Sequence, residues 1–492
     1  MNTWLRRVLY TTLTLMLTTA TLAGIAVAGV VATSRSTHQT VRTGASNPAL
    51  ASLGYAEPVG SAGHVTKQGR RLVVAFVAGQ SGTVASDLLA PYDIFASSPA
   101  FTTYVVAAGA GPAPLEGGPA VVPTHTFADV DADPALTPDL IVVPALSKPT
   151  GESEAPLRRW VSRQHDAGAR VLGVCAGALV LAATGMLDGL DATSHWSRIN
   201  ALQNQHPAVH WLRGRRYVED GTVTTTAAVT SGVQGALHLV AQLAGPAEAQ
   251  RVADQHPELG WTPNEPTTIG KDHFAVRDWP IGLNYLEPWF RPTIGIALHD
   301  GVGELDATAA FEVYGQSAAA HTIAMGTGDT VRTRHGLVLL TTPLTQAPDL
   351  SRVVVPGAGS SEAVDPRVRA WADHQHLAVE SLTGRPGPDG PGGGGFTAAL
   401  QNLADHTDAS TTRTTAKMIG YRTTELTLGP AHRSWRAFLL GLASLAVAIL
   451  LGLGPAHLSR RRTHRRERPR SSGAPPACPA YGRRVAVRRG LL

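Results

Sequence analysis

Short apolar runs alternate with segments of helical length along the middle of the chain. Each run is mainly Val, Ile, Leu and Ala and is bounded by Gly, Pro or polar residues, which is typical of strands buried on both faces. These runs are residues 71–77, 101–107, 139–144 and 171–174. The segments between them repeat apolar residues at helical spacing. Strands that alternate with helices in this way predict an α/β fold with a doubly wound parallel sheet.

The run 171–174 leads directly into Cys175, and the apolar segment 178–183 that follows is predicted to be a helix. Gly173 and Gly177 flank the cysteine, as a sharp strand-to-helix turn requires. This arrangement is typical of a nucleophile elbow, in which the thiol lies over a helix N-terminus that lowers its pKa. The alternative is a buried, unreactive cysteine packed under the helix.

The pattern of strands and helices starts again in the second part of the chain. Residues 293–298 predict a strand, 299–314 a helix and 352–359 another strand, which indicates an internal repeat. Where the second copy should have its elbow, residues 382–395 are rich in Gly and Pro and contain no cysteine. We interpret this copy as a degenerate domain whose role is packing.

Two long apolar segments bracket these domains. Residues 8–32 hold no charge and follow Arg6 and Arg7, which predicts an uncleaved membrane anchor, although a cleaved signal peptide is the alternative. Residues 435–453 predict a second span, and the arginine-rich stretch 460–468 follows it. Positive residues beside a span mark its cytoplasmic side. The sequence therefore predicts a cell-membrane protein with both termini cytoplasmic and the α/β body extracytoplasmic.

These patterns give a domain organisation for the whole chain of 492 residues. The expected parts are a signal anchor or signal peptide (1–34), a linker (35–69), a first α/β domain (70–255), a connector (256–290), a degenerate second domain (291–430), a transmembrane helix (435–454) and a basic cytoplasmic tail (455–492).

Composition narrows the possible functions. The chain is 43% hydrophobic and carries a net charge of +5, but the basic tail supplies this excess, so the domains offer no nucleic-acid surface. Its two cysteines, Cys175 and Cys478, lie in different regions, so we expect no disulfide. The histidines lack the spacing of metal ligands, and we expect neither a metal site nor a cofactor. The arginines of the tail either bind anionic lipids or only fix the membrane topology.

Five blocks of sequence resemble the ThiJ/PfpI family of the class I glutamine amidotransferase-like superfamily. The likeness is greatest to the ligand-sensing half of AraC-type regulators and to isonitrile hydratases. The blocks are residues 87–95, 174–189, 192–196, 216–221 and 229–232. The resemblance covers residues 70–255 well and 290–430 in part. It implies a flavodoxin-like doubly wound sheet, and it implies a homodimer because domains of this family commonly pair.

The resemblance also implies roles for three residues. Cys175 matches the family nucleophile, and Asp87 matches an acid near the start of the first helix that approaches the thiol. A protonated Asp87 could hydrogen-bond the thiolate or shuttle a proton, whereas the alternative is helix capping or solvation. His195 is a candidate base, although a structural hydrogen-bonding histidine fits it better.

The sequence departs from the family pattern around the cysteine. Ala176 replaces the histidine or threonine that other branches carry, and Ala145 replaces a glycine in a turn that helps to form an oxyanion hole. We nevertheless expect Ala145, Ala176, Thr230 and Ser231 to line the binding site. A Cys-His dyad is not expected.

Two functions compete at this stage. The first is binding or sensing of a small molecule in a pocket around Cys175, motivated by the missing histidine and the degenerate second copy. The second is a cysteine-dependent hydrolase, hydratase or glyoxalase-like enzyme acting on small carbonyl or nitrile-like compounds. The first is favoured.

Overall fold

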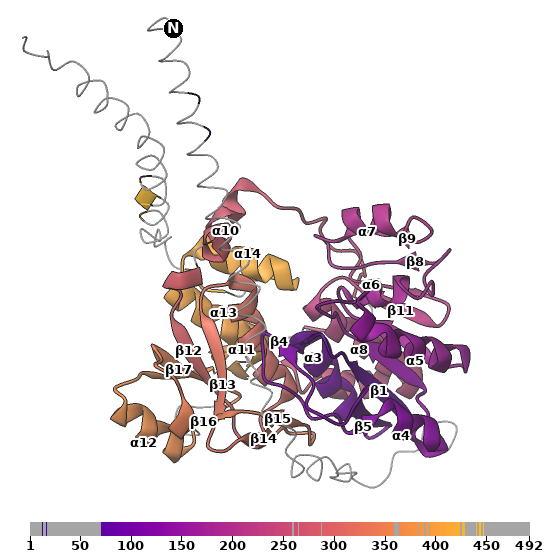
Figure 1. The fold of residues 1–492 in the computed structure, drawn as a ribbon, viewed down its shortest axis with the longest axis horizontal. Coiled ribbons are helices and arrows are strands. Elements are labelled where there is room, and N and C mark those ends of the chain that lie inside the picture. Colours follow the sequence, from indigo (N-terminus) through magenta and orange to yellow (C-terminus); the bar gives the residue numbers. More distant parts are fainter. Residues whose placement is uncertain are drawn as a thin grey trace, which may run out of the picture. The chain divides into compact units, whose positions relative to one another are not determined.

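The structure is a computed structural model of the chain (Figure 1). It describes residues 70–428, except 258–259, 264, 287, 359–363, 383, 388–389, 393 and 424–425, together with a few isolated residues near the two ends. We call residues 70–255 the first half and residues 291–428 the second half. The domain boundaries expected from the sequence stay a prediction.

The first half contains a seven-stranded sheet of order β10-β11-β7-β6-β1-β3-β5, in which only the β10–β11 pair is antiparallel. The strands are β1 (Leu72–Ala78), β3 (Phe101–Ala107), β5 (His125–Thr126), β6 (Leu140–Val143), β7 (Arg170–Gly173), β10 (Tyr217–Asp220) and β11 (Val223–Thr226). The chain winds outward from β1 first to one side and then to the other. The predicted doubly wound α/β fold is therefore present.

Helices cover both faces of this sheet because alternate residues of a strand point to opposite sides. In β1, Val74 and Phe76 belong to one hydrophobic core, and Val73, Ala75 and Val77 belong to another. The helices are α3 (Ala85–Ala96), α4 (Phe127–Ala132), α5 (Ala155–Asp166), α6 (Gly177–Ala182), α7 (Ile199–Gln205), α8 (Val229–Ala244) and α9 (Pro246–Ala253). Short two-residue strands β2 (Thr83–Val84), β4 (Leu115–Glu116), β8 (Asp191–Ala192) and β9 (His210–Trp211) pair outside the sheet.

The second half contains a parallel five-stranded sheet of order β16-β13-β12-β17-β18. Strand for strand, this order matches β5-β3-β1-β6-β7 of the first half. Its strands are β12 (Thr293–Ala297), β13 (His321–Gly326), β16 (Thr342–Pro343), β17 (Arg352–Pro356) and β18 (Val379–Leu382), and its helices are α11 (Glu304–Ser317), α12 (Pro366–His374), α13 (Gly395–His406) and α14 (Ala409–Ile419). The shared order supports the internal repeat inferred from the sequence.

Smaller elements complete the described part of the chain. They are helix α10 (Trp279–Leu286) in the connector, the hairpin β14 (Thr330–Arg332) and β15 (Val338–Leu340), and the pair β19 (Gly384–Gly387) and β20 (Gly390–Gly392).

The predicted membrane topology is corrected by the structure. Within the described residues no helix combines the length and apolar character needed to cross a membrane. The longest described helix, α8, has 16 residues, whereas a span needs about 20. The cell-membrane localisation with an extracytoplasmic body is thereby contradicted, and the flanking transmembrane helices are without support. The segments 8–32 and 435–453 lie, apart from isolated positions, outside the described residues.

The two halves meet where α3 packs against α11. These helices occupy equivalent places in the repeat, and residues 92–95 (Tyr-Asp-Ile-Phe) align with 311–314 (Phe-Glu-Val-Tyr). Ser86 Oγ donates a hydrogen bond of 2.6 Å to Glu312 Oε2, and the Leu305 N–H donates one of 2.9 Å to Asp93 Oδ2. In this alignment Ser86 corresponds to Leu305 and Asp93 to Glu312. The same pair of positions is therefore joined twice, once through a side-chain hydroxyl and once through a backbone N–H, as expected across a two-fold interface.

Equivalence extends to a second pair of acids. Asp87 corresponds to Asp306 in the same alignment. Asp87 Oδ2 accepts from the Ala145 N–H at 3.1 Å, and Asp306 Oδ1 accepts from the Gly395 N–H at 2.8 Å. Asp87 binds the segment that follows β6, whereas Asp306 binds the first residue of α13, so the two acids correspond in sequence but contact different segments.

One end of the interface buries an ionic cluster. Asp93 and Glu304 have no exposed surface, and His335 Nδ1 lies 2.8 Å from Glu304 Oε2 and 3.5 Å from Asp93 Oδ1. His256 Nε2 approaches the same Asp93 oxygen at 3.7 Å. Burial alone would lower the pKa of His335, but the hydrogen bond and charge of Glu304 and the charge of Asp93 raise it. The pKa of Glu304 is lowered by His335 against the effect of burial.

We predict that His335→Ala destabilises the protein by about 3 kcal/mol at pH 6, because it leaves two buried carboxylates facing one another. The raised pKa of His335 means that its contribution is complete below the unfolded-state pKa and is lost as pH rises through the folded-state pKa. The difference from wild type should therefore shrink at pH 9. Urea unfolding at both pH values measures it, with His374→Ala, an exposed histidine, as the control. Equal destabilisation at the two pH values would contradict this assignment.

Candidate functional site

Cys175 lies in a strained turn between β7 and α6. Its φ angle of 54° is in the left-handed region that non-glycine residues rarely occupy. The Cys175 N–H donates to Thr226 Oγ1 at 3.2 Å, and its carbonyl accepts from Ser194 Oγ at 2.9 Å. These contacts hold the strained backbone in place. The turn has the geometry expected of a nucleophile elbow.

Gly177 makes this turn possible because the chain passes close to β6 there. A Cβ atom at Gly177 would lie 2.1 Å from the Val143 carbonyl oxygen, well inside van der Waals contact. The glycine predicted from the sequence to permit a sharp turn is thus required by the approach of helix α6 to a neighbouring strand.

Two acidic side chains and one arginine act on the ionisation of the thiol, and the acids have the larger effect. Asp87 has no exposed surface, and its pKa is raised well above the ordinary value, first by burial and then by the charge of Glu312. The pKa of Cys175 is also raised well above its ordinary value, by burial and then by Asp87 and Glu312. The expectation that the helix N-terminus lowers the pKa of Cys175 is therefore wrong. Helix α6 has only six residues, and burial and neighbouring carboxyl groups outweigh it.

The two alanines that depart from the family pattern contribute through their backbone. A hydrogen bond from the Ala176 N–H favours the thiolate of Cys175 and partly opposes the rise in its pKa. The Ala145 N–H donates a hydrogen bond to Asp87 Oδ2 and so holds that carboxyl group in place. Ala145 is thus placed next to the site, with its amide already engaged.

His195 is fixed by hydrogen bonds on both ring nitrogens. Nδ1 lies 2.7 Å from Ser197 Oγ, and Nε2 lies 2.7 Å from the Met418 carbonyl oxygen at the end of α14. Because a carbonyl only accepts, Nε2 carries the proton and Nδ1 accepts from Ser197. Burial lowers the pKa of this histidine. The geometry favours the structural role over that of a base.

Thr230 and Ser231 lie at the start of α8. Thr230 Oγ1 donates to the carbonyl groups of Ile419 and Gly420, at 3.0 and 2.9 Å, and Ser231 is buried. Thr230, like His195, therefore contacts the C-terminal end of α14 in the second half. Its expected role in binding a ligand stays a prediction.

Sequence reasoning did not identify Glu312, which lies on α11 of the second half and raises the pKa of both Asp87 and Cys175. The available signal was the alignment of 311–314 with 92–95. The sequence also offered no reason to expect that Asp93, Glu304 and His335 lie together. One possible ligand atom from each lies within 4.8 Å of the others, a spacing that a metal ion could use. Because Glu304 and His335 already hydrogen-bond each other, we assign this cluster to the interface.

Comparison with known proteins identifies the fold family. The model of the DJ-1/PfpI family matches residues 73–242. The isonitrile hydratase of Pseudomonas putida is 35% identical over 192 residues, which make up 38% of this chain and 78% of that protein. The chain belongs to the DJ-1/PfpI family. The family suspected from the five sequence blocks is confirmed.

Two regulators are also similar to this DJ-1/PfpI chain. The HTH-type transcriptional regulator CdhR of Pseudomonas aeruginosa is 33% identical over 144 residues, which are 28% of this chain and 42% of that protein. The regulator GlxA of Rhizobium meliloti is 36% identical over 105 residues, 21% of this chain and 31% of that protein. The chain thus spans less than half the length of either regulator.

Two solved structures resemble part of the chain. A ThiJ/PfpI family protein from Pseudomonas syringae is 28% identical, with a TM-score of 0.34, covering 38% of this chain and 74% of that one. An AraC family transcriptional regulator from Pseudomonas putida is 19% identical, with a TM-score of 0.33. The match covers 38% of this chain and 98% of that one.

We predict that Gly177→Ala destabilises the protein by at least about 3 kcal/mol, because the added methyl group must displace the strand that carries Val143. Gly111→Ala is the matched control, since a Cβ there meets nothing within 4 Å, and it should change stability by no more than about 0.5 kcal/mol. Thermal and urea unfolding measure both variants. Similar stabilities of the two variants would argue against the close packing of the elbow.

We predict that Cys175 reacts slowly with iodoacetamide at pH 7 and titrates above the value of about 8.5 of a free thiol. The pH–rate profile should be measured in a Cys478→Ala background, so that Cys175 is the only cysteine that can react. Glu312→Gln and Asp87→Asn should each lower the apparent pKa, because each removes a neighbouring group that opposes ionisation. An apparent pKa below about 8 in the parent protein would contradict the acidic environment.

Proposed function

We propose that this DJ-1/PfpI chain binds or senses a small organic molecule at the site formed by Cys175 and Asp87. The observation that carries the proposal is the acidic surroundings of the thiol. Burial, Asp87 and Glu312 all favour the neutral thiol, whereas a cysteine nucleophile acts as the thiolate. A neutral thiol instead supplies a hydrogen-bond donor to a bound ligand.

The position of His195 supports the same reading. In cysteine-dependent catalysis a neighbouring base commonly activates the thiol. Here both nitrogens of His195 hydrogen-bond elsewhere, to Ser197 and Met418. The similarity to two transcriptional regulators is consistent with ligand binding without turnover.

A second candidate is a hydratase that acts on isonitrile or nitrile-like compounds. The observation that favours it is the similarity to an isonitrile hydratase over 78% of that protein, combined with the raised pKa of Asp87. A raised pKa favours the protonated carboxyl group, which is the form that acts as a general acid.

The full chain should be tested against a panel of small carbonyl, nitrile and isonitrile compounds. We expect at least one compound to raise the melting temperature without being consumed, and Cys175→Ala to weaken this stabilisation because it removes the thiol contact. Cys478→Ala, the other cysteine, is the control and should behave as wild type. Product formation that Cys175→Ala abolishes would replace the binding role with the hydratase.

A further inference from the structure

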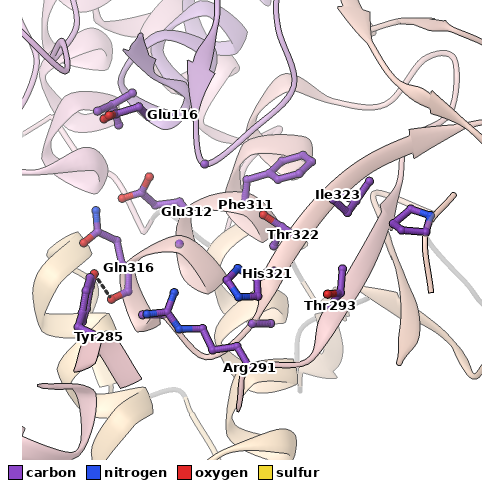
Figure 2. A pocket seen from close by; sticks show the side chains of 16 residues that line it. Glu116, Tyr285, Arg291, Thr293, Phe311, Glu312, Gln316, His321, Thr322 and Ile323 are labelled. Atoms are coloured by element: carbon purple, nitrogen blue, oxygen red, sulfur yellow. Dashed lines mark hydrogen bonds between the residues drawn. The ribbon is translucent and has the colours of Figure 1, made fainter. Parts of the chain in front are cut away.

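A cavity of about 590 Å³ lies between the two halves, within the range of roughly 300–1,000 Å³ that small-molecule sites occupy. It is lined by residues of the first half next to β2 and β4, by the connector, and by α11 and β13 of the second half. Figure 2 shows the side chains that line it. Cys175 does not line this cavity, so a ligand here would occupy a different place from the one proposed above.

One side of the cavity is acidic. Glu116 and Glu312 both line it and lie near one another in Figure 2. Glu312 is 6% exposed and accepts hydrogen bonds from Ser86 Oγ and Gln316, while Glu116 Oε1 accepts from Ser147 Oγ at 2.5 Å. All these donors are uncharged. Burial and the charge of Glu116 raise the pKa of Glu312, whose hydrogen-bond donors do not neutralise its charge.

Asp87, which is fully buried, adds a third carboxyl group to this acidic region. Its Oδ1 atom is buried and has no hydrogen-bond partner among the described residues, although buried polar atoms are normally paired. Both Glu312 and Glu116 contribute to the raised pKa of Asp87. A positively charged ligand in the cavity would stabilise the two carboxyl groups that line it, Glu116 and Glu312, which also act on the buried Asp87.

We propose that this cavity binds a small organic cation, with its ammonium group against Glu312 and Glu116. An ammonium group supplies the charge and the N–H donors that these carboxylates lack. Phe311 also lines the cavity, and an aromatic ring attracts a cation placed over its face. Arg291 lies on the other side in Figure 2, held by the Asn284 carbonyl oxygen, and would face the uncharged or anionic end of the ligand.

The test compares three probes of similar size and shape, 4-phenylbutylamine, 4-phenylbutanol and 4-phenylbutyrate, by titration calorimetry with the full chain. The amine should bind most tightly. Glu312→Gln should weaken its binding by at least about tenfold, since a charged hydrogen bond is lost, and Glu116→Gln should weaken it in the same direction. Glu152→Gln, an exposed acid away from the cavity, is the matched control. Binding should release protons, measurable in buffers of different ionisation enthalpy, because a neighbouring cation lowers the raised pKa of Glu312.

The proposal is overturned if the alcohol binds as well as the amine, if Glu312→Gln binds the amine as wild type does, or if the amine does not bind. Unfolding curves of both Gln variants show whether they remain folded. If Glu312→Gln does not fold, the decisive comparison is the binding of the amine by Glu116→Gln. Cys175→Ala should bind the amine like wild type. This result would separate the cavity from the Cys175 site, so that failure of either proposal leaves the other intact.

Discussion

The packing of α3 against α11 buries carboxyl groups from both helices at one interface. Asp87 and Asp93 come from the first half, and Glu304 and Glu312 come from the second. Buried charge is costly unless it is paired, and the two ends of the interface meet this constraint differently. Histidine accompanies Asp93 and Glu304, whereas hydroxyl and amide groups accompany Asp87 and Glu312. Histidines thus pair with the acids at one end, whereas burial raises the pKa of both acids at the other.

This difference explains the character of the cysteine site. The thiol of Cys175 lies at the end of the interface that holds Asp87 and Glu312, and together with burial their charges outweigh that of Arg198, which favours the thiolate. The strained backbone of the elbow and the electrostatics around it therefore have opposite effects on the reactivity of the thiol. The backbone presents the side chain at the edge of the sheet, and its surroundings keep that side chain neutral.

Local patterns in the sequence predicted the parts of the fold that depend on neighbouring residues. The strands of the first sheet, the turn at Cys175 and the glycine at 177 follow from apolar runs and small residues that are adjacent in the chain. Glu312 and His335 were missed because their importance arises only when α11 packs on α3, more than 200 residues away in sequence. The pKa of Cys175 was predicted in the wrong direction for the same reason. The membrane prediction rested on hydropathy at the two ends, and the described helices do not support it.

The sequence predicts that the second half is a packing domain. Its contacts show that it also contributes side chains and backbone groups to the region of Cys175. It supplies Glu312 to the region of Cys175, and the end of α14 binds both His195 and Thr230. The exchanged contacts of Ser86 with Glu312 and of Leu305 with Asp93 place it where a symmetric partner would lie.

Joining both partners in one polypeptide has an evolutionary consequence. In a dimer of identical subunits every substitution appears at both sites, so neither site can change alone. Here each half mutates independently. Asp306 retains the acid at the position of Asp87 but binds the first residue of α13, and residues 382–395 contain no cysteine. One copy could thus lose its nucleophile and reshape the shared interface without altering the other, which is how a symmetric arrangement acquires a single specialised site.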